Sequence, residues 1–193
     1  MLNNVSDSFA NALCRNLLSP SVLDQGFQSG VFIAAGGNTP PEAAVLDTLT
    51  NNLAKVDARV ARMCAEELGS DDVLERVTEA VRTQVMDTIW GRRPGGLKDL
   101  VRQITQDGTP FVMLIENIDA WLDSSEGVRM LCALKAIRDA TNLPPGHGGK
   151  FLLVGIGASP KMIALTQDRS QAFYGAVYLT LADQHVRSTA VGQ

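Results

Sequence analysis

The sequence predicts an α/β fold, a three-layer arrangement in which a parallel sheet of about five strands has helices on both faces. Two observations predict it. Short apolar runs at 111–115 and 151–156 have the length and composition of strands buried on both sides. Spans with helical spacing of apolar residues separate the strands, which is typical of right-handed crossovers between parallel strands. We therefore expect one domain over residues 1–193, with an N-terminal helix within 1–20 and a core over 30–181.

The first half of the chain is expected to open with a helix. Apolar residues recur every four positions at Val5, Phe9, Leu13 and Leu17, and form one stripe of a helix. Pro20 ends this helix, because the residue before a proline avoids the α conformation. The next expected elements are a strand at 30–35 that breaks at a glycine pair, a helix at 40–54, a weaker strand at 56–64 and a long helix at 71–90 that ends at a glycine-rich turn.

The second half contains the clearest strands. A helix over 97–106 leads through a Gly-Thr-Pro turn into the apolar strand at 111–115. The helix expected over 126–140 places Val128, Leu131, Leu134 and Ile137 on one face. The remaining expected elements are a strand at 151–156, a short helix at 161–166 and a strand at 176–181.

The charge of the chain gives no strong signal for nucleic-acid binding. Its net charge is −4, with 17 basic and 21 acidic residues. Duplex-binding surfaces usually have a basic excess, because counterion release supplies much of the affinity. No basic segment followed by an apolar run opens the chain, and no stretch reaches the roughly 18 apolar residues of a membrane helix. These features predict a cytoplasmic protein without a membrane span.

Cysteine and histidine usage argues against disulfides and metal binding. Cys14, Cys64 and Cys132 lie far apart in apolar stretches, so we expect buried, reduced thiols. His147 and His185 have no second ligand at the spacing of a zinc site, so no metal site is expected.

Two stretches resemble a known family. Residues 111–121 read Phe-Val-Met-Leu-Ile-Glu-Asn-Ile-Asp-Ala-Trp, which resembles the Walker B segment of AAA+ and related P-loop ATPases. The strand at 151–159 and the run Asp-Arg-Ser-Gln-Ala-Phe-Tyr-Gly at 168–175 look like the sensor strand and following loop of bacterial and archaeal ATPase-domain proteins. The resemblance covers mainly 110–181. It implies a P-loop NTPase-like core, and because the chain stops after the fifth strand, no helical lid domain is expected.

The resemblance assigns five side chains to the ATPase site. Glu116 takes the position of the magnesium-holding acid, Asn117 that of the general base, and Asp119 that of the following acid. An asparagine cannot accept the proton that a carboxylate accepts. Ser159 takes the position of the sensor residue, with a helix cap as the structural alternative. Arg169 matches the basic residue of the family's loop, with a surface or loop-tying arginine as the alternative.

The loop after the first expected strand has the length of a phosphate loop and different chemistry. A working loop reads Gly-x-x-x-x-Gly-Lys-Ser/Thr, with backbone amides and a lysine facing the phosphates. Here Gly36, Gly37, Asn38 and Thr39 are followed by two prolines and Glu42, so no register supplies the lysine. The prolines have no N–H to donate, and Thr39 and Glu42 form a helix capping box. We interpret this loop as vestigial.

Together these features predict a degenerate, non-hydrolysing ATPase-fold protein that regulates or inhibits a partner through protein–protein contact. An active ATPase is the candidate partner, and a plasmid or phage is a conceivable setting. No cofactor and no metal are expected. One alternative is an ATPase that binds ATP and magnesium through an atypical loop. The other is a structural subunit of a larger assembly that docks through its N-terminal helix; a homo-oligomer is also left open.

Overall fold

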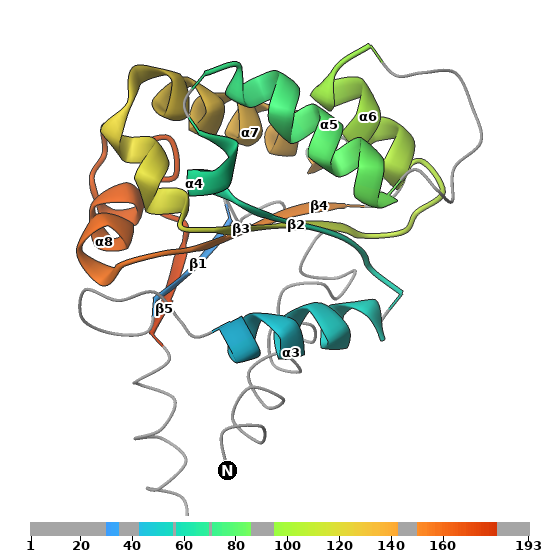
Figure 1. The fold of residues 1–193 in the computed structure, drawn as a ribbon, viewed down its shortest axis with the longest axis horizontal. Coiled ribbons are helices and arrows are strands. Elements are labelled where there is room, and N and C mark those ends of the chain that lie inside the picture. Colours follow the sequence, from blue (N-terminus) through green and yellow to red (C-terminus); the bar gives the residue numbers. More distant parts are fainter. Residues whose placement is uncertain are drawn as a thin grey trace, which may run out of the picture.

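Five parallel strands form one sheet in the order β2-β3-β4-β1-β5 (Figure 1). The strands are β1 (Val31–Ala34), β2 (Arg59–Cys64), β3 (Phe111–Glu116), β4 (Phe151–Ile156) and β5 (Val177–Thr180). Every described pairing is parallel, and β1 lies between β4 and β5 although it comes first in the chain. The predicted parallel sheet is therefore confirmed, with each of its strands at the expected place.

The computed structural model describes residues 30–34, 43–55, 57–69, 71–85, 95–142 and 150–180. Several expectations lie outside these ranges: the N-terminal helix within 1–20, the vestigial loop with Gly36, Gly37, Asn38 and Thr39, Cys14, both histidines and the last part of the long helix predicted at 71–90.

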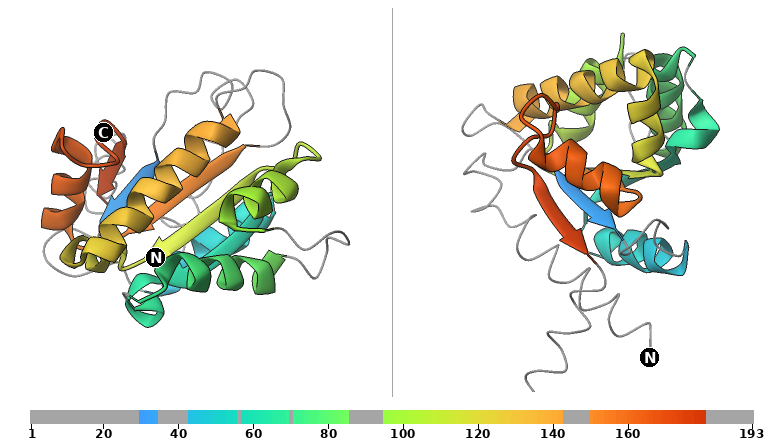
Figure 2. Two further views of the ribbon diagram at one scale, coloured as in Figure 1. Left: turned by 90° about the horizontal axis from the view of Figure 1, so that it is seen from above. Right: turned by 90° about the vertical axis from the view of Figure 1, so that its left-hand side faces the viewer.

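The helices pack on both faces of the sheet, as predicted (Figures 1 and 2). They are α3 (Ala43–Ala54), α4 (Ala65–Leu68), α5 (Val73–Val85), α6 (Leu97–Thr105), the 3₁₀ helix η2 (Ile118–Asp123), α7 (Ser125–Asn142) and α8 (Ser159–Gln167). Leucines of α3 pack on one face of the sheet with Val112 and Leu114 of β3. The other face, with Phe111, Met113 and Ile115, is covered by the helices from α4 onward. Alternate residues of each strand thus face two separate cores.

The central strands are buried on both faces, whereas β2 at the edge alternates. Ala61 and Met63 of β2 are buried, while Val60 and Arg62 are half-buried. Because of this alternation, β2 had the weakest sequence signal of the five predicted strands. No helix in the described ranges is long and apolar enough to cross a bilayer.

A buried asparagine joins the end of α7 to the start of β4. The side chain of Asn142 accepts a hydrogen bond from the Phe151 N–H at 2.8 Å and donates to the Phe151 carbonyl oxygen at 2.8 Å. Both bonds are buried, so each stabilises more than an exposed one would. They fix the point at which β4 enters the sheet.

The structure corrects three expectations about local burial. Val128 was expected on the same face of α7 as Leu131, Leu134 and Ile137, which are buried, but Val128 is 39% exposed and Met130 is buried. The reason is that α7 begins against Trp121, where Gly127 makes the close contact. Cys132 is exposed and Cys64 is half-buried, so the expectation of buried thiols is wrong for both; each is a free thiol, as expected.

Two short elements were not predicted. Residues of α4 read Ala-Glu-Glu-Leu, which is too short for a periodic pattern. Residues of η2 follow the left-handed Asn117 immediately after β3. Both lie beside the carboxyl edge of the sheet, where they position the side chains described next.

Candidate functional site at the carboxyl edge of the sheet

The carboxyl ends of β3 and β4 bring four of the predicted site residues to one edge of the sheet. Ligands of open α/β sheets bind outside this edge. Glu116 is the last residue of β3, and Asn117 and Asp119 follow it. Ser159 begins α8 just after β4. The geometry therefore brings these four residues to the same edge, although their chemical roles stay predictions.

Glu116 is engaged by an arginine from the neighbouring strand. Arg62 of β2 donates a hydrogen bond from Nε to Oε1 of Glu116 and another from Nη1 to Oδ1 of Asp47 in α3. The side chains of Arg62 and Glu116 are 27% and 23% exposed, while that of Asp47 is 62% exposed. The pKa of Arg62 is raised above its usual value, mainly by the hydrogen bond to Glu116. One guanidinium thus joins the end of β3 to α3.

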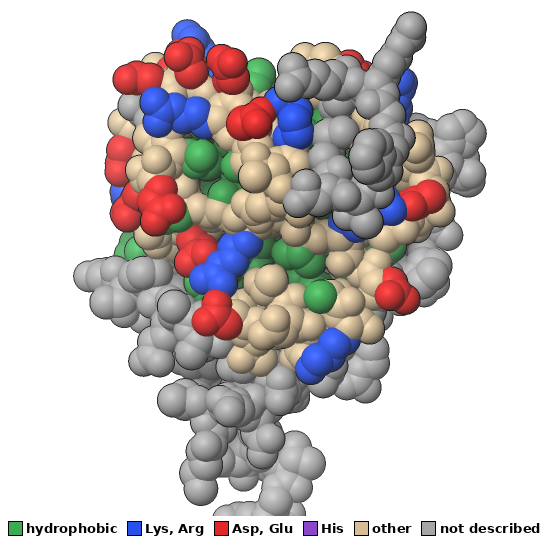
Figure 3. All heavy atoms as spheres, turned by 45° about the vertical axis from the view of Figure 1, so that its right-hand side comes forward, with side chains coloured by type: hydrophobic (Ala, Val, Ile, Leu, Met, Phe, Trp, Pro, Cys, Tyr) green, Lys and Arg blue, Asp and Glu red, His purple; other side chains and the backbone are tan. Residues whose placement is uncertain are grey.

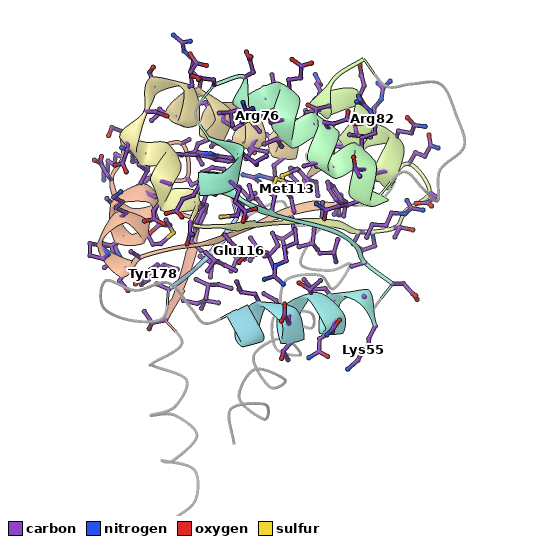
Figure 4. All side chains as sticks on the ribbon, in the orientation of Figure 1. Lys55, Arg76, Arg82, Met113, Glu116 and Tyr178 are labelled. Carbon is purple, nitrogen blue, oxygen red and sulfur yellow. The ribbon has the colours of Figure 1, made fainter. Side chains whose placement is uncertain are left out.

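The position of this arginine follows from the alternation of the strand. Arg62 is aligned with Leu114 of β3, and Leu114 faces α3. Glu116 is two residues further along β3 and so faces the same side. Figure 4 labels Glu116 at this end of β3, and Met113 among the side chains of the opposite core. The sequence did not predict that Arg62 and Asp47 belong to this site. The available signal was an arginine within a strand whose neighbouring residues are apolar.

The resemblance implies ATP and magnesium at this edge, and the described residues fit that pair poorly. Magnesium in such sites is held by one or two side chains together with phosphate oxygens. The acid in the appropriate position already binds a guanidinium, whose positive charge would repel a metal ion at the same carboxylate.

Asn117 has a structural task at the end of β3. Its backbone is left-handed, with φ 50° and ψ 35°, a conformation in which asparagine is favoured over most residues. Its Nδ2 donates to Oε2 of Glu66 in α4 at 3.1 Å. The side chain therefore holds α4 against the turn into η2. An amide used in this way offers no base for proton transfer.

Asp119 lies against the residue that follows β4. A Cβ atom added to Gly157 would collide with Oδ1 of Asp119, so a larger residue at position 157 would require this carboxylate to move. Lys161 of α8 is close by and donates to Asp123 at 2.7 Å. The pKa of Lys161 is raised, mainly by this hydrogen bond and less by the charge of Asp119. These contacts join η2 to α8 across the end of β4.

Ser159 and Arg169 differ in how the structure places them. The Oγ of Ser159 is buried without a hydrogen-bond partner in the described structure. The N-cap of α8 is Ala158, so the alternative that Ser159 caps the helix is wrong. Arg169 is exposed, and its guanidinium carbon lies 5.9 Å from the ring centroid of Tyr174. That contact agrees with the loop-tying alternative, since cation–π pairs of this kind stabilise modestly.

Comparisons with known proteins support the fold. No family model and no curated protein matches the sequence. Among solved structures, the chain is similar to the ORC1 protein of Aeropyrum pernix in complex with DNA, with a TM-score of 0.58, 18% identity and coverage of 97% of this chain. It is also similar to Drosophila ORC bound to DNA, with a TM-score of 0.56, 14% identity and coverage of 95%.

The chain spans about half the length of these two structures, 49% and 48% respectively. At such low identity the likeness shows the fold alone. The chain therefore has an α/β fold similar to the matched parts of these two structures.

Proposed function

We propose that this chain is a non-hydrolysing ATPase-fold protein that regulates or inhibits a partner by protein–protein contact. The observation that carries the proposal is the pairing of Glu116 with Arg62 and of Arg62 with Asp47. Phosphoryl transfer depends on positioned positive charge and on a base or water-orienting group. Here the acid that would hold the metal is neutralised from within the chain, and an amide takes the place of the base.

The sequence of the predicted phosphate loop gives independent support. It has no lysine for the phosphates and carries Glu42 after a proline pair. A scaffold that keeps its fold without the groups for catalysis can still present surfaces to other proteins. The step from scaffold to partner is an analogy, because one fold serves many functions.

Titration calorimetry with ATP and magnesium tests the first half of the proposal. We expect no binding at micromolar concentrations and no phosphate release above a buffer blank. Micromolar binding that Glu116→Ala weakens would instead establish the alternative, an ATP-binding protein with an atypical loop. Glu126→Ala is the matched control, since Glu126 also pairs with an arginine, Arg129, but lies at the start of α7.

An Arg62→Met variant separates the role of the guanidinium from that of the fold. If Arg62 is what keeps a metal from Glu116, millimolar magnesium should raise the melting temperature of the variant more than that of the wild type. An equal response of the two proteins would show that the arginine does not govern this carboxylate.

A test of the second half of the proposal, regulation of a partner, requires that the partner be identified. Affinity purification from the native cell should recover a protein partner, and the ATPase rate of the recovered complex should change when this chain is removed. An unchanged rate would contradict regulation of an ATPase. It would favour the structural-subunit alternative, which deletion of residues 6–18 and measurement of assembly size then tests.

DNA contact is a second candidate because both similar structures are complexes with DNA. The charges of this chain argue against it. Many described basic side chains are in ion pairs with acids, namely those of Arg59, Arg62, Arg82, Arg129, Lys135, Arg138 and Lys161. Figure 3 shows acidic and basic side chains mixed over one face rather than a basic patch. Fluorescence anisotropy with a labelled duplex tests this, and submicromolar affinity that falls steeply with salt would establish DNA binding.

A further inference from the structure

The outer edge of β2 is occupied by a side chain from α5. β2 ends the described sheet, so alternate residues direct their backbone N–H and C=O groups away from β3. Arg59 donates its N–H to Pro110 at 2.9 Å and therefore faces β3. By alternation, Val60, Arg62 and Cys64 face outward. These outward groups are what a strand from another chain would pair with.

Gln84 takes the place of such a strand at the central outward residue. The Arg62 N–H donates to Oε1 of Gln84 at 2.8 Å, and Nε2 of Gln84 donates to the Arg62 carbonyl oxygen at 2.7 Å. The side-chain amide offers the same donor and acceptor as a backbone peptide group. Gln84 lies near the end of α5, which Val81 and Val85 anchor in the core.

The side chain of Arg62 is not available to protect this edge. A charged side chain on an edge strand commonly prevents pairing with another chain. Here the guanidinium is turned onto Asp47 and Glu116, toward the face covered by α3. Beyond Cys64 the chain enters α4, which shortens the open edge at that end. With Arg62 paired, the outward groups of Val60 and Cys64 are left separated from each other.

We propose that Gln84 closes the β2 edge against strand addition by a second copy of this chain. Two hydrogen bonds from one amide satisfy the central residue and interrupt the row of groups that a strand must match. Removing the amide opens the N–H and C=O of Arg62 beside the outward groups of Val60 and the N–H of Cys64, whose carbonyl oxygen begins α4, and these groups form a continuous row for a short intermolecular ladder. The inference concerns self-association and does not depend on the proposed regulatory function.

Gln84→Ala in the full chain tests the proposal, with Thr83→Ala as the matched control. Thr83 is also exposed on α5, and its hydroxyl donates only to Glu79 of the same helix, at 3.0 Å. Sedimentation velocity over a 100-fold concentration range, taken as roughly 1–100 μM, measures association. We expect the sedimentation coefficient of Gln84→Ala to rise with concentration relative to the wild type, and that of Thr83→Ala to follow the wild type.

Hydrogen exchange of the backbone N–H of Arg62 shows directly whether the β2 edge is the surface that associates. At low concentration this amide should exchange about tenfold faster in Gln84→Ala than in the wild type, as expected for a lost bond of about 1.4 kcal/mol. At high concentration its protection should return. Gln84→Glu, which keeps the acceptor and loses the donor, should give an intermediate result and is the second variant if Gln84→Ala fails to fold.

Three outcomes would overturn the proposal. The first is an unprotected Arg62 amide in the wild type. The second is a Gln84→Ala protein that sediments like the wild type at every concentration. The third is association of the variant without recovery of Arg62 protection, which would place the contact on another surface.

Discussion

Gly155, next to the last residue of β4, provides the sharpest test of how this core is packed. It is aligned with Phe32 of β1, whose ring leans across the strand boundary onto it. A Cβ atom at position 155 would be 2.6 Å from two ring carbons of Phe32 and 3.1 Å from Ile118. Carbon atoms in contact are normally about 3.5–4.0 Å apart, so Gly155→Ala must move the ring by roughly 1 Å. Phe173 limits that movement, since its ring centroid is 5.0 Å away.

Two opposing effects decide the size of the change in stability. Replacing a strand glycine by alanine removes chain entropy from the unfolded state and stabilises by about 0.5–1 kcal/mol. Overpacking of a close-packed core costs about 1–3 kcal/mol. We therefore expect Gly155→Ala to lower the free energy of unfolding by about 1–2 kcal/mol, which corresponds to a fall in Tm of roughly 2–8 °C for a protein of this size.

A double-mutant cycle with Phe32→Leu tests the cause. The shorter leucine should make room for the new methyl group, so the two substitutions should be less harmful together than their sum by at least about 1 kcal/mol. Urea unfolding of the four proteins measures this coupling. Additive effects would refute the steric explanation. Gly95→Ala is the control, because the nearest atom to a Cβ there is 3.6 Å away, and it should change stability by less than about 0.5 kcal/mol.

Three further outcomes can be measured in the same way. Asn142→Ala leaves the buried N–H and C=O of Phe151 without partners and should lower the free energy of unfolding by about 2–4 kcal/mol in urea titrations. Asn117→Ala should lower the free energy of unfolding by about 1 kcal/mol more than Asn117→Gly, because glycine adopts the positive φ of 50° more freely than alanine. Both variants lose the amide contacts, so equal losses of stability would show that the backbone conformation contributes nothing further. The pKa of Asp107 is lowered from 3.8 to about 2, mainly by the hydrogen bond from Arg59. Its stabilisation is therefore present above about pH 4 and lost as the pH falls toward 2, so Asp107→Asn should remove a pH dependence of less than about 1 kcal/mol, a small effect because the pair is partly exposed.

The strands were predictable because their signal is local. The runs that became β3 and β4 are apolar throughout, which is what burial between two layers of helices requires. The helix α4 and the 3₁₀ helix η2 were not predictable, since short elements carry no periodic pattern and depend on tertiary contacts. The exposure of Val128 was not predictable for a related reason. Helical spacing predicts which residues share a face, but not whether the first turn of that face is buried.

The site was predictable in position and only in part in chemistry. Glu116 and Asn117 were expected at the end of a strand, and the fold places them there with Ser159 on the same edge. The partner of Glu116 was not foreseen, because Arg62 is 54 residues away in the chain and Asp47 lies 15 residues before Arg62. Ion pairs over such separations follow from strand order, which a single sequence does not specify.

The hydrogen bonds of Asn142 to both backbone groups of Phe151 have a practical consequence for engineering the protein. They join the two ends of the intervening connection directly, so the entry of β4 into the sheet does not depend on how many residues lie between. The entropy of closing a connection also changes slowly with its length, by about 0.6 kcal/mol for each doubling. A change in the number of residues between Asn142 and Lys150 should therefore be compatible with the pairing of β4, provided that Asn142 itself is kept.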